Sequence, residues 1–406
     1  MPSFLTPLLV VLLPLVGSSS LHLFLPVVAP LLMDAAGADP TSYGWIAGAA
    51  GLGSIWLYMS NHGFTPALGP LRALRVGALI AVLGAALVMG ATVPLMVVGA
   101  VLIGFGYATS TPAGSQILAD HIPKHQWSTI FSLRQAGVPL GGVIAGGAGA
   151  WLIAQFGWRP AFVLITLISL MFAVPLLLAP SRFNTSRPLN AFRLGALFAP
   201  SNLKRPFRAL TLGPGLVRLA LACVGFATVQ SACFSFFVIY LHAGLGYGLT
   251  LAGALFAALQ GASVLGRIVF GIVADRVGSP RPVLMVLAVC SSMSALMLAA
   301  LDPGHDAPFL FAVAVIAGSS VATWNGLYLA EAASLAPPDA VSEVTAGTTF
   351  FVFLTYTVSP PVFGVLISTF GYESAFIAAA VGAAFSGVVL LLGFQGKPKA
   401  TSKAAG

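Results

Sequence analysis

The sequence predicts an all-α integral membrane protein with twelve transmembrane helices, arranged as two six-helix pseudo-repeats. Three observations predict this fold class: the composition, a series of long apolar runs, and a basic polar segment that divides the runs into two sets. Of the 406 residues, 58% are hydrophobic and only 7% are charged. A soluble domain carries roughly 25% charged residues, so this chain could not cover itself with a polar surface.

The apolar runs account for the individual helices. A helix needs about 20 mostly apolar residues to cross the hydrocarbon core of a bilayer. Pro, Gly and clusters of charge divide the chain into twelve such runs. The runs cover residues 6–33, 41–60, 73–92, 94–119, 128–154, 158–180, 215–242, 249–271, 282–301, 307–335, 342–368 and 372–394. The first run lacks a basic start and exceeds the ~7–15 apolar residues of a signal peptide, so we interpret it as a membrane helix.

The distribution of Lys and Arg predicts the orientation of the chain. With the N-terminus inside, the internal loops, the start of the seventh span and the tail hold fifteen basic residues. The external loops hold only Arg159. Because cytoplasmic loops carry an excess of Lys and Arg, both termini are predicted to lie in the cytoplasm, with the chain in the cytoplasmic (inner) membrane. The net charge of +8 is interpreted as loop charge and not as a nucleic-acid surface.

A polar segment, residues 181–214, divides the twelve runs into two sets of six. It holds six Lys or Arg residues and no acid, and a short amphipathic helix there would favour an anionic membrane surface. The predicted organisation is an N-terminal six-helix half at 1–180, a basic cytoplasmic linker at 181–214, a C-terminal six-helix half at 215–396 and a cytoplasmic tail at 397–406.

The two halves are also related in sequence. Residues 104–162 align with 318–376 without a gap, and fourteen of the aligned pairs are identical. The alignment includes FGWRPAF against FGYESAF. A parallel six-plus-six repeat is the layout of one large class of transporters, in which the substrate lies between the halves near the middle of the membrane.

A charged turn follows the eighth run, in GRIVFGIVADRVGSPRP (266–282). Gly278 permits a tight reversal because it has no Cβ, and Asp275 can accept hydrogen bonds from the positive end of a neighbouring helix. Together with Gly271 and Arg276, these residues resemble the loop signature of the major facilitator superfamily, G-x-x-x-D-R-x-G. The stretch departs from the signature after its last glycine, where the family usually has a basic residue and this chain has Ser.

The resemblance implies that the turn is a gate element, whose contacts form in one transporter state and break in another. In the first half, the register of the repeat alignment places Asn61 opposite Asp275 and His62 opposite Arg276. Both charged groups are lost there, so we expect a weaker latch in the first half. The alternative is that Asp275 and Arg276 are only solvated loop charges.

Four polar residues within the predicted spans stand out: His22, Arg134, Arg267 and Glu331. A charged residue at mid-membrane costs roughly 2.5–3.5 kcal/mol on insertion scales, so such residues usually face a cavity and mark function. RIVFGIVAD around Arg267 resembles the eighth span of monocarboxylate transporters, and oxalate/formate exchangers have similar basic positions. The resemblance implies that the Arg267 guanidinium binds a substrate carboxylate, which its planar fork suits. Alternatively, Arg267 reaches the inner membrane face or pairs with Glu331.

The other candidates also have two interpretations each. Arg134 is either a second anion contact or part of the inner mouth. His22 is either a proton-coupling group, because histidine changes charge near physiological pH, or a neutral hydrogen-bonded side chain. Glu331 is either a proton carrier or the counter-ion of Arg267. By analogy with the family, spans 1, 4, 7 and 10 line the cavity. Their polar and aromatic candidates are Tyr107, Thr109, Gln116, Gln230, Ser231, Tyr240, Trp324, Asn325 and Tyr328.

The sequence as a whole predicts a secondary active transporter of a small organic solute, expected to be a carboxylate-bearing anion, with proton coupling or exchange. One alternative is a proton-driven exporter of hydrophobic or cationic compounds, with Glu331 as its acid; another is a membrane sensor or scaffold without flux. No metal-ligand spacing, nucleotide loop or nucleophile motif is present, so no enzyme activity, cofactor or metal is expected. The expected partners are the substrate, protons or a counter-substrate, and the lipid bilayer. No nucleic acid is expected, and the chain is expected to act as a monomer.

Overall fold

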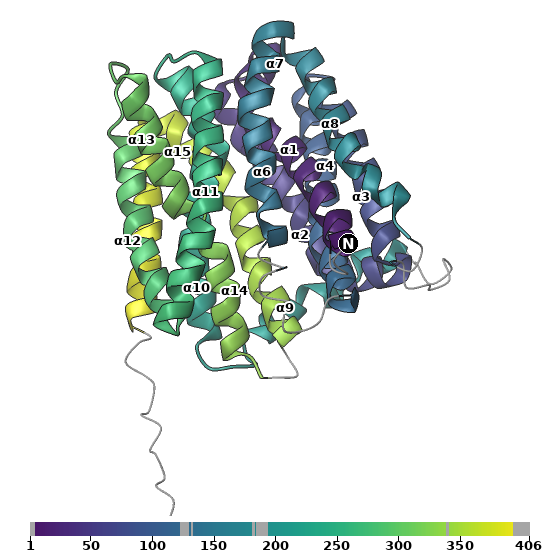
Figure 1. Cartoon of the computed structure of the whole chain (residues 1–406). Helices are drawn as coiled ribbons and strands as arrows, with labels where there is room; N and C mark the ends of the chain where they lie inside the picture. Colours follow the sequence, from purple (N-terminus) through teal and green to yellow (C-terminus); the bar gives the residue numbers. More distant parts are fainter. Residues whose placement is uncertain are drawn as a thin grey trace, which may run out of the picture.

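Long α-helices run side by side along one common axis (Figure 1). The computed structural model describes residues 5–121, 130, 133–180, 183, 194–337 and 341–392. The N-terminal group consists of α1 (Leu5–Ala35), α2 (Tyr43–Leu68), α3 (Pro70–Val88), α4 (Val93–His121), α6 (Gly137–Val143), α7 (Gly149–Phe156) and α8 (Trp158–Leu178). The C-terminal group consists of α10 (Leu216–Ile239), α11 (Leu249–Val277), α12 (Pro280–Ala299), α13 (Ala307–Val321), α14 (Trp324–Leu335) and α15 (Val341–Leu392). Figure 1 shows the first group on the right and the second on the left.

The twelve predicted membrane helices are confirmed. Ten stretches of the described chain are long and apolar enough to cross a membrane, among them 133–156, where η3 (Ile144–Ala148) connects α6 to α7. The helix α2, with 26 residues, adds one to the ten. The 52 residues of α15 add another, because the chain turns at Gly371 and divides α15 into two helices.

The tenth predicted span, residues 307–335, differs from the prediction because it is interrupted. The helix α13 ends at Val321 and α14 begins at Trp324, with Ala322 and Thr323 in a turn between them. The end of a helix leaves backbone carbonyls without intrahelical partners, so other donors must satisfy them. The interruption therefore places hydrogen-bond acceptors inside the bundle.

The internal repeat is visible in the backbone. Gly157 connects α7 to α8 with φ 80° and ψ 170°, and Gly371 connects the two arms of α15 with φ 82° and ψ 171°. These two glycines are counterparts in the repeat alignment. Glycine adopts positive φ without a Cβ penalty, so the same residue makes the same turn in both groups.

Each group also uses an arginine to satisfy a carbonyl of its last helix. Arg75 of α3 donates from Nε and Nη2 to the Leu176 carbonyl at 2.9 and 2.6 Å. Arg281 of α12 donates from Nη2 to the Leu390 carbonyl at 2.7 Å. The acceptors Leu176 and Leu390 are counterparts when the repeat alignment is continued in the same register, whereas the two donor arginines are not.

The two groups meet backbone to backbone near η1 (Pro40–Ser42), at the end of the bundle that we call the η1 end. The opposite end, which holds α9 (Arg205–Ala209), is the α9 end, at the bottom of Figure 1. A Cβ on Gly48 of α2 would lie 2.7 Å from the Thr357 carbonyl oxygen of α15. A Cβ on Gly146 of η3 would lie 2.6 Å from the Gly253 carbonyl oxygen of α11. Glycine thus permits two close seams between the groups.

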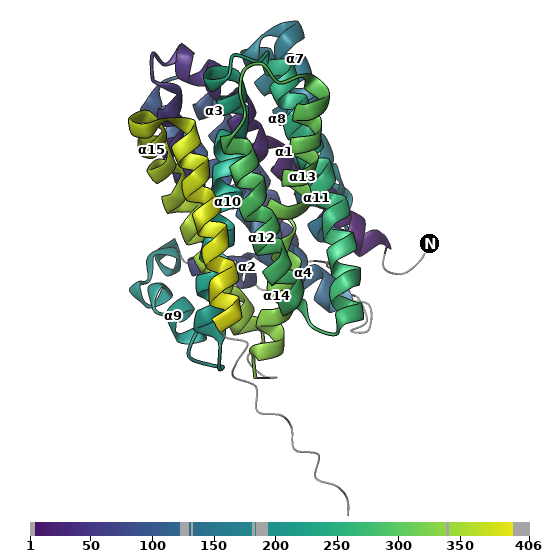
Figure 2. The ribbon, with the colours of Figure 1, turned by 90° about the vertical axis from the view of Figure 1, so that its left-hand side faces the viewer.

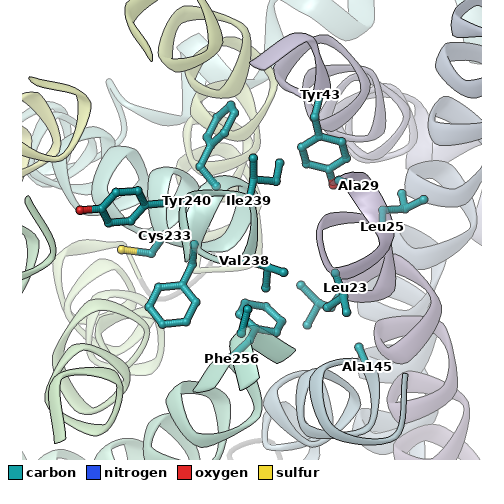
Figure 3. Close-up of a cluster of buried hydrophobic side chains, with 14 of the residues drawn as sticks. Leu23, Leu25, Ala29, Tyr43, Ala145, Cys233, Val238, Ile239, Tyr240 and Phe256 are labelled. Atoms are coloured by element: carbon teal, nitrogen blue, oxygen red, sulfur yellow. The ribbon is translucent and has the colours of Figure 1, made fainter. Parts of the chain in front are cut away.

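Apolar side chains fill the η1 end between these seams. Figure 3 shows side chains of this cluster from four helices, among them Leu25 and Ala29 of α1, Tyr43 of α2, Ile239 of α10 and Phe256 of α11. All five side chains are at most 2% exposed. The η1 end is therefore closed by a packed cluster to which both groups contribute.

Candidate substrate site

A cavity lies between the two groups, next to the apolar cluster. It has a volume of about 200 Å³ and is lined from α1, α2, α4, α6, α10, α11, α14 and α15. Seven residues singled out in the sequence line it: His22, Tyr107, Gln230, Ser231, Arg267, Asn325 and Tyr328. The fold thus brings together seven of the predicted side chains, from the five helices α1, α4, α10, α11 and α14.

Arg267 projects from α11 into the space between the groups. Its Nε and Nη2 donate to the Ala322 carbonyl at 3.2 and 3.0 Å, and its Nη1 donates to the Gln135 carbonyl at 3.2 Å. Ala322 belongs to the turn between α13 and α14, so Arg267 satisfies a carbonyl that the interrupted helix leaves open. Gly266 allows this approach, because a Cβ there would lie 2.5 Å from the Thr323 side chain.

Arg267 has no acidic neighbour among the described residues of the cavity wall. None of the described residues that line the cavity is Asp or Glu. The hydrogen bonds of Arg267 go to neutral carbonyls, and the side chains of Tyr107 and Tyr356 are among its neighbours. Because a desolvated cation is costly unless it is paired, this site favours an anionic occupant.

Two side-chain pairs form polar parts of the cavity wall. In the N-terminal group, the His22 ring stacks on the Tyr107 ring, with centroids 4.7 Å apart and planes inclined by 11°. His22 Nδ1 has no hydrogen-bond partner in the described part of the chain. In the C-terminal group, Asn325 Nδ2 donates to Gln230 Oε1 at 3.2 Å. The cavity therefore offers an aromatic wall on one side and an amide wall on the other.

Arg134 lies behind the cavity wall and not among the lining residues. Its side chain is 1% exposed, and its Nη2 donates to the Ser110 carbonyl at 2.6 Å. Gly114 of α4 makes room for it, because a Cβ there would lie 2.9 Å from Arg134 Nε. Two lining residues, Tyr58 and Tyr107, are within its electrostatic range. Arg134 therefore adds positive potential to the cavity from the second layer of side chains.

Trp324 and Glu331 of α14 also lie outside the cavity lining. Trp324 is 0% exposed and stacks on Phe226, with ring centroids 5.3 Å apart. Glu331 is 8% exposed. The described hydrogen bonds of Arg267 go to carbonyls and not to Glu331, so the ion pair considered from the sequence is not formed in this structure.

The charged turn forms the end of α11, at the α9 end of the bundle. Gly278 adopts φ 73°, and its N–H donates to the Asp275 carbonyl at 3.2 Å. Asp275 and Arg276 are both exposed. Asn61, which the register of the repeat alignment places opposite Asp275, lies within α2, eight residues before the Gly69 that caps it, and accepts a hydrogen bond from Thr65 Oγ1 at 2.6 Å. Asn61 is therefore bonded within its own helix and does not lie at a helix end, as Asp275 does.

Sequence reasoning missed several residues of the site. Tyr58 of α2 and Gln135 line the cavity, and so does one face of α15 that includes Val352, Tyr356 and Pro360. The spacing of four residues along α15 is the helical repeat of a single face. That spacing was the available signal, but aromatic and small residues on an apolar helix are equally typical of ordinary packing.

Comparison with known proteins identifies the family. The sequence model described as Major Facilitator Superfamily matches residues 10–355. An uncharacterized MFS-type transporter of Mycobacterium tuberculosis is 25% identical over 375 residues, which make up 88% of this chain and 79% of that protein. The cis,cis-muconate transport protein of Acinetobacter baylyi is 27% identical over 178 residues, which make up 41% of this chain and 40% of that protein.

Solved structures share the arrangement of helices. A bacterial homolog of the human lysosomal transporter Spinster, in an inward-facing and unoccupied conformation, superposes with a TM-score of 0.74 and 17% sequence identity. The match covers 96% of this chain and 98% of the other. The family match over most of the chain and the shared fold agree with the twelve helices and the central cavity. The chain belongs to the Major Facilitator Superfamily and is a multi-pass membrane transporter.

Proposed function

We propose that this protein is a secondary active transporter of a small organic carboxylate, and that Arg267 binds the carboxylate. One observation carries the proposal: Arg267 lines the cavity with only neutral hydrogen-bond partners, and no described lining residue is acidic. A guanidinium donates two parallel, charge-assisted hydrogen bonds to a carboxylate, each worth about 1.5–3 kcal/mol. The name of the related muconate transport protein, which describes a carboxylate cargo, adds support.

The bond between Arg267 and Gln135 connects binding to movement. A carboxylate at Arg267 competes with the Gln135 carbonyl for Nη1, and a bond to an ionised acceptor is stronger than a bond to a neutral one. Gln135 belongs to the N-terminal group and Arg267 to the C-terminal group. When the carboxylate replaces the Gln135 carbonyl as the acceptor, a hydrogen bond between the two groups is lost. Substrate binding thereby shifts the balance between conformations that open on opposite sides.

We also propose that the protein lies in the cytoplasmic (inner) membrane, with the α9 end of the bundle facing the cytoplasm. This orientation is supported by the distribution of Lys and Arg, with fifteen on the predicted cytoplasmic side and one, Arg159, on the external side. The glycine seams and the apolar cluster then close the external side. A proton-driven exporter of cationic compounds would need an acid in the cavity, and Glu331 is not among its lining residues, so we do not propose that function.

Uptake into proteoliposomes tests the substrate class. With the purified full chain we expect uptake of small labelled carboxylates, competed by unlabelled carboxylates. The amide and the amine of the same carbon skeleton should not compete, because neither carries the negative charge that Arg267 binds. Competition by the amine together with no competition by the carboxylate would contradict the proposal.

We further propose that His22 carries the coupled proton, because it lines the cavity and its Nδ1 has no described partner. Replacing His22 with Gln is expected to abolish uptake driven by an acid-outside pH gradient, while exchange of internal for external carboxylate persists within about threefold. Gradient-driven and exchange fluxes are measured in the same vesicles. His305→Gln is the matched control, since that ring bonds to Asp302 in a loop at the η1 end. Equal gradient dependence in both variants would exclude His22 as the proton carrier.

A further inference from the structure

The described end of the linker lies along the flank of the bundle, apart from the cavity. It consists of η6 (Leu194–Phe198), η7 (Pro200–Leu203) and α9, which Figure 2 shows beside the lower part of α15. In the N-terminal group, Trp56 Nε1 of α2 donates to the Leu197 carbonyl at 3.2 Å. In the C-terminal group, Phe207 of α9 contacts Phe351 of α15, with ring centroids 5.5 Å apart. The linker therefore connects α2 to α15.

Its attachment to α2 lies within the second predicted membrane span, residues 41–60. Trp56 lies thirteen residues after the start of α2 at Tyr43, which corresponds to roughly 20 Å along a helix. The hydrocarbon core of a bilayer is about 30 Å thick. Leu52, one turn before Trp56, is 52% exposed and marks the outer face of α2. The segment η6 thus packs on the outer flank of α2, where lipid would otherwise lie.

The outward surface of the linker combines apolar and basic side chains. Phe198, Leu203 and Phe207 are 67%, 55% and 56% exposed. The residues Lys204, Arg205 and Arg208 are exposed beside them. The segment 181–214 contains no acid. Apolar side chains at the acyl boundary with basic side chains at the headgroup level are the arrangement that binds an anionic membrane surface.

We propose that the surface formed by Phe198, Leu203, Lys204, Arg205, Phe207 and Arg208 is a docking site for anionic phospholipid. The three basic side chains bind the headgroup phosphates, and the exposed faces of the three apolar side chains lie against the acyl chains. Because the linker contacts α2 and α15, the bound lipid stabilises the attachment of both helices at the α9 end. This inference does not depend on which solute the protein transports.

Native mass spectrometry and thermal unfolding of the full chain test the docking site, with phosphatidylglycerol or phosphatidylcholine as the added lipid. We expect the wild type to retain phosphatidylglycerol in preference and to unfold at a higher temperature with it. The variant K204Q/R205Q/R208Q should bind phosphatidylglycerol about tenfold or more weakly and lose the added stability, because each basic residue contributes to surface binding. The tail variant K397Q/K399Q/K403Q removes the same charge and should retain the preference.

Three outcomes would overturn the docking site. These are an equal loss in both triple variants, no preference in the wild type, or the same stabilisation by inorganic phosphate. If the triple linker variant does not purify, the single variants K204Q and R205Q serve, each with an expected loss of about threefold. Unchanged lipid retention in those single variants also contradicts the proposal.

Discussion

Replacing Arg267 with Gln is expected to weaken carboxylate binding by at least about 100-fold and to abolish measurable uptake. The substitution removes two charge-assisted hydrogen bonds to the carboxylate. The loss of about 3 kcal/mol of binding free energy corresponds to that factor. Gln keeps one amide donor for the Ala322 carbonyl, so the interruption between α13 and α14 is still satisfied. Isothermal titration with a carboxylate ligand measures the affinity, and uptake into proteoliposomes measures the flux.

The Arg267→Lys variant separates the effect of the positive charge from the effect of the two parallel guanidinium donors. It keeps the positive charge but not the planar pair of donors, so we expect about a tenfold loss of affinity. Arg159→Gln is the matched control, because Arg159 is exposed at the η1 end and its guanidinium lies 4.7 Å from the Trp158 ring centroid. Affinity should stay within about twofold in that control. If Arg267→Gln binds carboxylate like the wild type but transports it slowly, Arg267 only forms a hydrogen bond to Gln135 between the two groups and is not a carboxylate ligand.

The helices could be predicted from the sequence because their causes are local. The sequence alone shows the apolar runs of sufficient length and the glycines between them, such as Gly157 and Gly371 at the turns. The interruption between α13 and α14 at Ala322 and Thr323 could not be predicted from the sequence, because neither Ala nor Thr breaks a helix by itself. Arg267 donates to the Ala322 carbonyl and Gly266 allows α11 to approach, so residues of another helix satisfy the interruption.

The site could be predicted in part, for a similar reason. Arg267 and His22 stand out because a polar side chain in an apolar run is conspicuous. Arg134 is equally conspicuous but lies behind the wall, since its place is decided by the space that Gly114 leaves. Gln135 contacts Arg267 through its backbone carbonyl, and every residue has that group. No pattern of side chains can reveal such a partner.

Replacing Gly146 with Leu is expected to hold the two groups apart at the η1 end. A Cβ at this position would lie 2.6 Å from the Gly253 carbonyl oxygen and 2.8 Å from the Ala257 backbone nitrogen. Both are backbone atoms that cannot rotate away, so α11 must move. Overpacking costs typically ~1–3 kcal/mol, and only the conformation with this seam closed bears the cost. The equilibrium should therefore shift by roughly 5- to 150-fold toward opening at the η1 end.

Gly147→Leu is the matched control for the seam, because a Cβ there would lie 3.7 Å from Ala257 Cβ, in ordinary contact. Spin labels at Phe156 and Thr250, both exposed and on opposite groups, report the separation at the η1 end. The distance should lengthen in Gly146→Leu and stay unchanged in Gly147→Leu. Because each transport cycle must pass through the closed seam, turnover should fall by at least about fivefold in Gly146→Leu alone. Identical distances in the two folded variants would show that the seam does not limit opening.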